Sequence, residues 1–167
     1  MATGLTQTQS EQQAIDITTF ISEYYINEVK QLISEKHYFV AFLVISSGIE
    51  FLGKAISDHD WSKTGTSRED FNSALSAFLS LKKYSNLGLE FDNAKNDTSF
   101  YTIVRCGIVH ASRPMLGITL SEGNNNLPNK IGITDLYSDF NDACNDLLNG
   151  VVPLGNGKNL SDTICYY

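Results

Sequence analysis

The sequence predicts a mainly α protein, a helical bundle of five helices with one small β-hairpin. Apolar residues recur at three- and four-residue steps through several long segments, which is the period of an amphipathic helix. Capping residues, proline and glycine fall at the ends of those segments. A chain of 167 residues with 42% hydrophobic and 19% charged residues is typical of one globular domain with its own core.

The first two predicted helices cover residues 11–35 and 37–57, after a polar segment, 1–10, that we expect to be flexible. The first helix carries apolar residues along one face at helical spacing. The second stays apolar as far as Ile56, which is too long for an ordinary strand, so we expect a buried helix at the centre of the core. Its longest apolar run, Tyr38–Ile45, is too short to span a membrane.

The next two helices are marked by their ends. Ser67 is a capping hydroxyl with Asp70 at the third helical position, and this helix is predicted to end near Lys83. After a connection over residues 84–97, another amphipathic helix runs to just before Pro114, because proline cannot continue it. The cap of that helix is one of three successive polar residues, Asp97, Thr98 or Ser99.

After Pro114 the pattern changes to that of short strands. Residues with high β-propensity on both sides of an Asn- and Gly-rich turn predict a hairpin at about 115–133. A last helix, Leu136–Leu148, follows Thr134 or Asp135 as its cap and ends at an Asn-Gly pair.

No linker or internal repeat divides the chain. A single helical domain is therefore predicted over residues 11–150, followed by a C-terminal tail, 151–167. The N-terminal residues lack the basic start and apolar core of a signal peptide, so we expect a cytoplasmic protein with no membrane segment.

Charge and cysteine content exclude several classes of function. The formal net charge is −7, which argues against a protein that coats nucleic acid non-specifically, although a local basic site remains compatible with it. Cys106, Cys144 and Cys165 match neither a disulfide framework nor a metal site. We therefore expect no metal and no cofactor.

Arg105 and His110 are the residues most suited to chemistry. Both lie opposite the apolar stripe of their predicted helix, about 140° apart, with small or apolar residues between them. The guanidinium group of arginine can hold a phosphate, and histidine can take a proton from a 2′-hydroxyl or give one to a leaving oxygen. The alternative is structural: Arg105 pairs with a carboxylate and His110 is a satisfied interior or interface residue.

The motif RCGIVH, within FYTIVRCGIVHASRP, resembles the signature of the HEPN superfamily, in which four to six residues separate an arginine from a histidine on a late helix. The segment ISSGIEFLGKAI is similar to the second helix of that family. The resemblance covers about residues 13–113. It implies an up-and-down HEPN-like four-helix bundle, here with a small β-hairpin and an extra C-terminal helix.

The resemblance also implies a function. Many HEPN proteins are metal-independent endoribonucleases of toxin or defence systems, and they form homodimers in which two motifs share a cleft. Carried over, Arg105 would bind the scissile phosphate and His110 would act as acid or base. Cys106 departs from the Asn, Asp or His that usually follows the arginine. The alternative is therefore a non-catalytic HEPN module for dimerisation or for binding RNA, a nucleotide or a cognate partner protein.

Three further residues are candidates for the cleft. Glu50 and Lys54, four residues apart on an otherwise apolar helix, are predicted to form an ion pair that can reach Arg105, or to line the cleft. Arg113 is either a second cation near the cleft or a partner for the carbonyl groups at the end of its helix.

Overall fold

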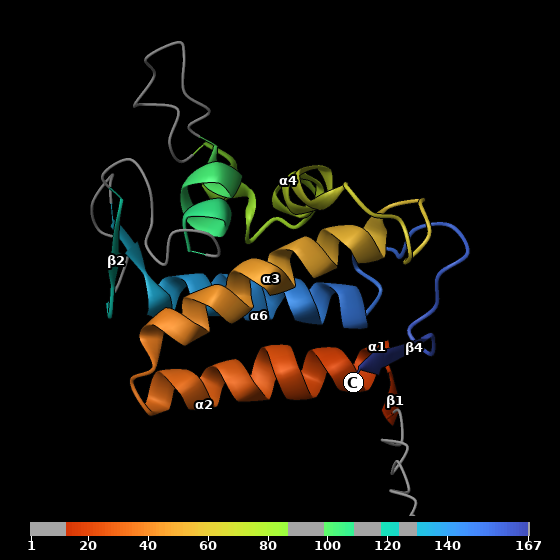
Figure 1. Ribbon diagram of the computed structural model, residues 1–167, viewed down its shortest axis with the longest axis horizontal. Helices are drawn as coiled ribbons and strands as arrows, with labels where there is room; N and C mark the ends of the chain where they lie inside the picture. Colours follow the sequence, from red (N-terminus) through yellow and green to blue (C-terminus); the bar gives the residue numbers. More distant parts are fainter. Residues whose placement is uncertain (1–12, 87–98, 109–117, 124–129, 167) are drawn as a thin grey trace, which may run out of the picture.

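The computed structural model confirms a mainly helical protein (Figure 1). It describes residues 13–86, 99–108, 118–123 and 130–166. Helix α3 runs through the middle of the molecule, and three other helices pack around it. Helix α3 spans Tyr38–Ile56, and the three around it are α2 (Glu28–Ser34), α4 (Ser67–Ala77) and α6 (Ile133–Leu148).

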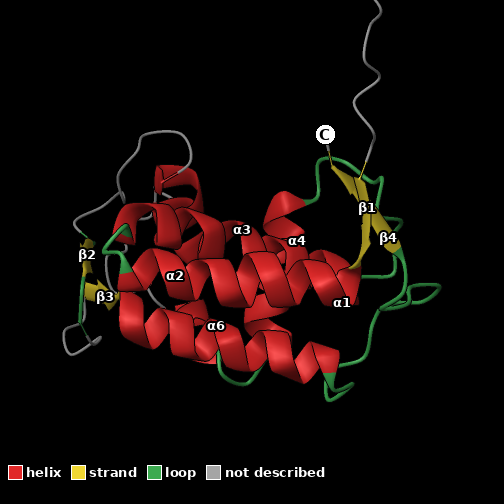
Figure 2. Cartoon of the chain, turned by 90° about the horizontal axis from the view of Figure 1, so that it is seen from below, coloured by secondary structure: helices red, strands yellow, loops and turns green. Residues whose placement is uncertain are grey.

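Helix α3 confirms the predicted central helix over residues 37–57. Its apolar side chains supply much of the core, and they are fully or almost fully buried at Phe42, Ile45, Ile49 and Leu52. Figure 2 shows α2 and α6 side by side, with α3 behind them and a small two-stranded sheet at each end of the molecule.

The helix predicted over residues 11–35 differs from the expected one at its start. Residues Gln13–Asp16 form strand β1, which pairs antiparallel with strand β4 (Thr163–Tyr166) near the other end of the chain. Helical structure follows as α1 (Ile17–Phe20), the π-helical segment η1 (Ile21–Asn27) and then α2. Hydrophobic periodicity does not reveal this pairing, because the partner strand is about 150 residues away in sequence.

Helix α4 begins at Ser67 as expected, but its capping position is occupied by Thr66. It ends at Ala77 and not near Lys83, because Phe78 adopts an extended conformation. A short 3₁₀ segment, η2 (Lys82–Asn86), follows. Some apolar residues beyond Ala77, such as Phe78 and Leu81, are still buried, whereas Leu79 is exposed. Their spacing in the sequence therefore resembles that of a continuing helix.

The segment around Arg105 contains the π-helical turn η4 (Tyr101–Cys106). Of the three candidate caps, Asp97 and Thr98 lie outside the described residues, and Ser99 acts as a cap. Its Oγ accepts a hydrogen bond from the backbone N–H of Thr102 at 3.3 Å.

The predicted hairpin is wrong in direction. Strands β2 (Thr119–Ser121) and β3 (Lys130–Gly132) form a pair, but the two strands run parallel. Alternating apolar residues identify a strand without fixing the direction of its partner. The turn region, 124–129, lies outside the described residues.

Helix α6 confirms the last predicted helix, although it begins three residues earlier, at Ile133. It ends at the expected Asn-Gly pair, where Gly150 has a φ of 70°. The predicted tail then returns to the body: the N–H of Gly155 donates to the carbonyl of Ala55 at 3.0 Å. The expected flexible segment, 1–10, lies outside the described residues.

Helix α3 is also long and apolar enough to cross a membrane by length and composition, with a mean hydropathy of 1.8. The uninterrupted apolar run Tyr38–Ile45 is too short for a span, whereas the whole helix, which ends at Ile56, is long enough. A core helix of a soluble protein can have the same composition, and half of the most apolar window is buried within the structure.

Helices α3 and α4 approach each other most closely at Gly53. A Cβ atom at this position would lie 1.6 Å from the backbone carbonyl oxygen of Asp70. Backbone atoms cannot move aside as the end of a side chain can, so only glycine permits this contact.

Replacing Gly53 with alanine should therefore lower the free energy of unfolding by about 3 kcal/mol, because the two helices have to separate. Helix propensity alone would give the opposite sign, since alanine favours a helix by about 1 kcal/mol over glycine. The measurement is urea unfolding, with Val40→Ala on the exposed side of α3 as a control expected to change little. An unchanged or increased stability for Gly53→Ala would contradict the close approach.

Candidate functional site

Arg105 lies against helix α3 and forms an ion pair with Glu50. Its Nε donates to Glu50 Oε2 at 2.8 Å. Both side chains are largely buried, with 18% of Arg105 and 22% of Glu50 exposed. This is the arrangement of the structural alternative, in which Arg105 pairs with a carboxylate.

The ion pair places Arg105 on a different side of its helix from the predicted one. A regular α-helix puts Arg105 opposite the apolar stripe, facing solvent. In the π-helical turn η4, hydrogen bonds join residues five apart and the turn is wider than in an α-helix. The angular positions of the residues therefore change, and Arg105 faces α3.

Tyr101 lies one turn before Arg105 and contacts two cations. The guanidinium carbon of Arg105 is 6.0 Å from the centre of the Tyr101 ring, and that of Arg68 is 5.4 Å from it. Burial raises the pKa of Tyr101, and so does its hydrogen bond with the Cys106 thiol, whereas the Arg105 charge lowers it. The phenol therefore stays neutral near neutral pH, and its ring is available to both cations.

The structure does not bring together all the residues that the sequence singles out. Cys106 is half-buried on η4 beside Tyr101. His110 and Arg113 lie outside the described residues. Their positions relative to Arg105, including the angle between Arg105 and His110, stay predictions.

Lys54 does not form the predicted ion pair with Glu50 in the described part of the chain. Its Nζ instead donates to the carbonyl of Lys63 and lies 3.4 Å from Thr66 Oγ1. Glu50 pairs with Arg105 instead, and the loop over residues 57–66 folds back across α3, which brings new acceptors to Lys54. Spacing along one helix predicts a pair within that helix but does not show which residues of other segments bind the same side chains.

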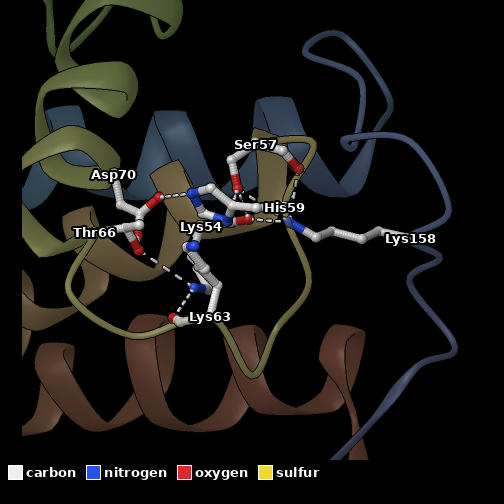
Figure 3. A network of polar contacts seen from close by, with 7 residues as sticks. All are labelled: Lys54, Ser57, His59, Lys63, Thr66, Asp70 and Lys158. Carbon is white, nitrogen blue, oxygen red and sulfur yellow. Dashed lines mark hydrogen bonds and ion pairs between the residues drawn. The ribbon is translucent and has the colours of Figure 1, made fainter.

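A chain of polar contacts connects Lys54 to the start of α4 (Figure 3). Thr66 Oγ1 donates to Asp70 Oδ2 at 2.7 Å, and Asp70 Oδ1 lies 3.1 Å from His59 Nε2. The latter contact is an ion pair without the geometry of a hydrogen bond, and neither atom has a hydrogen-bond partner among the described residues. Ser57 Oγ lies 3.0 Å from the other ring nitrogen, His59 Nδ1. The carboxylate of Asp70, which is 3% exposed, therefore holds the 57–66 loop against α4.

Lys158 binds the C-terminal end of α3 from the last segment of the chain (Figure 3). Its Nζ donates to the carbonyls of Lys54 and Ser57, the latter at 2.7 Å, and lies 4.7 Å from the centre of the Trp61 ring. Only 8% of the residue is exposed. Burial lowers the pKa of Lys158, and the Lys54 charge lowers it further, against the effect of nearby aspartates. A cation at the end of a helix dipole satisfies carbonyls that have no partner within the helix.

An open pocket of about 490 Å³ lies beside Arg105, Lys54 and Asp70. Its wall is formed by one side of α3, Tyr25 of η1, the second half of the 57–66 loop, the first turn of α4 and Arg105. The charged groups that line it are three cations, Lys54, Lys63 and Arg105, and two carboxylates, Glu50 and Asp70. The pocket is thus locally cationic on a protein whose formal net charge is −7.

Comparison of the chain with protein-family models gives no match, and comparisons with curated proteins and with solved structures give none either. Within the described residues, no group of three or more His, Cys, Asp or Glu side chains could hold a metal ion.

Sequence reasoning identified Arg105, Glu50 and Lys54 but missed the rest of the pocket. The loop sequence Lys-Thr-Gly-Thr-Ser, residues 63–67, combines a cation, hydroxyls and a glycine immediately before a helix, and this was a usable signal. No signal identified Lys158, because its partners lie about 100 residues earlier in the chain.

Replacing Lys158 with methionine should lower the free energy of unfolding by about 2 kcal/mol. Methionine keeps the apolar stem beside Trp61, but two carbonyls at the end of α3 lose a charged donor. The measurement is chemical unfolding followed by the fluorescence of Trp61.

Lys30→Met is the matched control, since Lys30 is exposed on α2 and makes no polar side-chain contact among the described residues. We expect it to change stability by less than about 0.5 kcal/mol. Equal effects of the two substitutions would show that Lys158 does not support α3.

Proposed function

We propose that this protein is a HEPN-like homodimer that binds RNA at Arg105 and cleaves it by a metal-independent reaction, in a toxin or defence role. Two features support the proposal: the motif RCGIVH in its longer sequence context, and a mainly helical fold in which the motif begins beside a central helix. The HEPN-like four-helix bundle is part of the proposal.

The hydrogen bonding of the Arg105 guanidinium is the observation that supports this proposal most. Only Nε of the guanidinium is engaged by Glu50, and the terminal nitrogens have no hydrogen-bond partner among the described residues. These two nitrogens are the pair that binds a phosphate in the bidentate geometry. Glu50 therefore orients the guanidinium while its other edge stays available, next to a pocket with an excess of positive charge.

In the proposed reaction, Arg105 holds the scissile phosphate and stabilises the charge that develops on its oxygens. His110 removes the proton from the 2′-hydroxyl or donates one to the leaving 5′-oxygen, and the second role falls to another group or to the partner's motif. The 2′-oxygen forms a bond to phosphorus as the bond to the 5′-oxygen breaks. RNA supplies its own nucleophile in this chemistry.

A non-catalytic module is the second candidate, and Cys106 favours it. The thiol occupies the position where active ribonucleases usually carry Asn, Asp or His, and it contacts Tyr101. A thiol is a weak hydrogen-bond donor and orients a phosphate or a histidine poorly. On this alternative, the same surface dimerises or binds RNA, a nucleotide or a partner protein.

Single-turnover cleavage of a mixed RNA pool in the presence of a chelator separates the two candidates. We expect the wild type to cleave, and Arg105→Ala and His110→Ala each to reduce the rate by at least about 100-fold. His37→Ala removes an exposed histidine from the start of α3 and serves as the matched control, with an unchanged rate.

Sedimentation of each variant checks that dimerisation is unchanged. A folded wild-type dimer that cleaves no RNA between about pH 5 and pH 9, the range over which histidine titrates, would rule out the ribonuclease and leave the binding module. Equal loss in His37→Ala would show that the effect is not specific to the motif.

A further inference from the structure

We propose that the pocket beside Arg105 contains a second phosphate-binding subsite, formed by Lys63, Thr64 and Ser67, which takes the phosphate next to the scissile one on an RNA strand. This inference rests on the proposed function, because it assigns the strand that Arg105 holds. It gives a binding role to the Lys63–Ser67 segment, in which the sequence pattern indicated only a helix start at Ser67.

The first argument is the state of the polar groups that line the pocket. Both carboxylates are engaged: Glu50 by Arg105, and Asp70 by Thr66 and His59. By contrast, the side chains of Lys63, Thr64 and Ser67 have no hydrogen-bond partner among the described residues. The terminal nitrogens of Arg105 have none there either. The unengaged groups are therefore all able to donate, whereas each carboxylate already faces a positively charged or donating side chain: Arg105 for Glu50, and Thr66 and His59 for Asp70.

The second argument is charge. Three cations and two carboxylates line the pocket, so it has a net positive charge although the whole chain is acidic. A ligand with several oxygen acceptors and a negative charge is complementary to this arrangement, and a phosphate has both properties. A cationic ligand would be repelled by this excess of positive charge, and both carboxylates already have partners.

The third argument is that the subsite is held in place by residues that would not bind the ligand themselves. Lys54 donates to the Lys63 carbonyl, and Thr66 is fixed by its hydrogen bond to Asp70. The Thr66 hydroxyl donates to Asp70 and makes no capping hydrogen bond to the first N–H groups of α4. The loop is thus fixed through its backbone, and its outward side chains remain available to a ligand.

The fourth argument is that both halves of the pocket are anchored on one helix. Glu50, which holds Arg105, and Lys54, which holds the Lys63 carbonyl, lie one turn apart on α3. Arg105 and the Lys63–Ser67 segment are therefore fixed to the same rigid element.

Trp61 provides a direct readout of binding. It is the single tryptophan of the chain, it lies two residues before Lys63, and its ring stacks on the pocket residue Phe51 with 5.5 Å between ring centres. A ligand that contacts the loop is expected to change its fluorescence. The probe is a short 2′-O-methyl RNA with hydroxyl groups at both ends, which binds without being cleaved.

The variant Lys63→Ala tests the subsite without disturbing the fold. The Lys63 side chain is exposed, and the two contacts of this residue, to Lys54 and to the Asp60 carbonyl, are made by its backbone. We expect the substitution to weaken RNA binding about fivefold and to reduce the slope of log affinity against log salt by about 0.7. Lys30→Ala, with the same change of charge on α2, should leave both quantities unchanged.

Equal effects of Lys63→Ala and Lys30→Ala would overturn the subsite, since they would indicate non-specific attraction. Titration with a nucleoside diphosphate and with inorganic phosphate identifies the source of the phosphate. Binding of either one, weakened by Lys63→Ala, without binding of the RNA would overturn the assignment to a strand.

Failure of this inference and failure of the proposed function give different results. RNA binding that depends on Lys63 without any cleavage would support the subsite and contradict the ribonuclease. Cleavage that depends on Arg105, together with equally tight RNA binding by Lys63→Ala and the wild type, would support the ribonuclease and overturn the subsite.

Discussion

The contact between α3 and α4 at Gly53 determines the geometry of the pocket. Two helix backbones meet there, and the absence of a side chain permits the approach. The chain must then leave α3, reverse through the 57–66 loop and enter α4 within a short distance. The loop therefore lies across the end of α3, and Lys54 and Asp70 reach it from opposite sides. A wider separation of the helices would move these two anchors apart.

Several polar groups around this contact are held by charged partners, although Asp70 Oδ1 and His59 Nε2 face each other without a hydrogen bond. Lys158 donates to two carbonyls at the end of α3, and the Asp70 carboxylate accepts a hydrogen bond from the Thr66 hydroxyl and lies beside His59. Buried charges are costly unless they are paired, so these contacts leave little freedom to the residues that make them. The side chains of Lys63, Thr64 and Ser67, which have no hydrogen-bond partner among the described residues, line the pocket. Unpaired donors are expected on a binding surface and not in a structural core.

The sequence predicted most of the helices because each depends on local information. Apolar spacing and end signals located α3 and α6 to within a few residues. The sheets could not be predicted in the same way: β1 pairs with a strand from the other end of the chain, and the direction of β2 and β3 depends on the path between them. The candidate site was predicted in part. Arg105 and Glu50 came from a motif and a helix pattern, but their contact depends on a π-helical turn, and the partner of Lys54 is a loop backbone.

The position of Lys158 has a practical consequence for work on this protein. Helical content alone suggests that the folded unit is complete at the end of α6, near residue 150. A shortened version ending there would keep every long helix, yet it would lack both Gly155, which packs on the backbone of Ser57, and the lysine that neutralises the end of α3. Such a fragment would pass a test of helicity by circular dichroism while its 57–66 loop lost its support. A negative binding or cleavage result from that fragment would describe the truncation and not the protein.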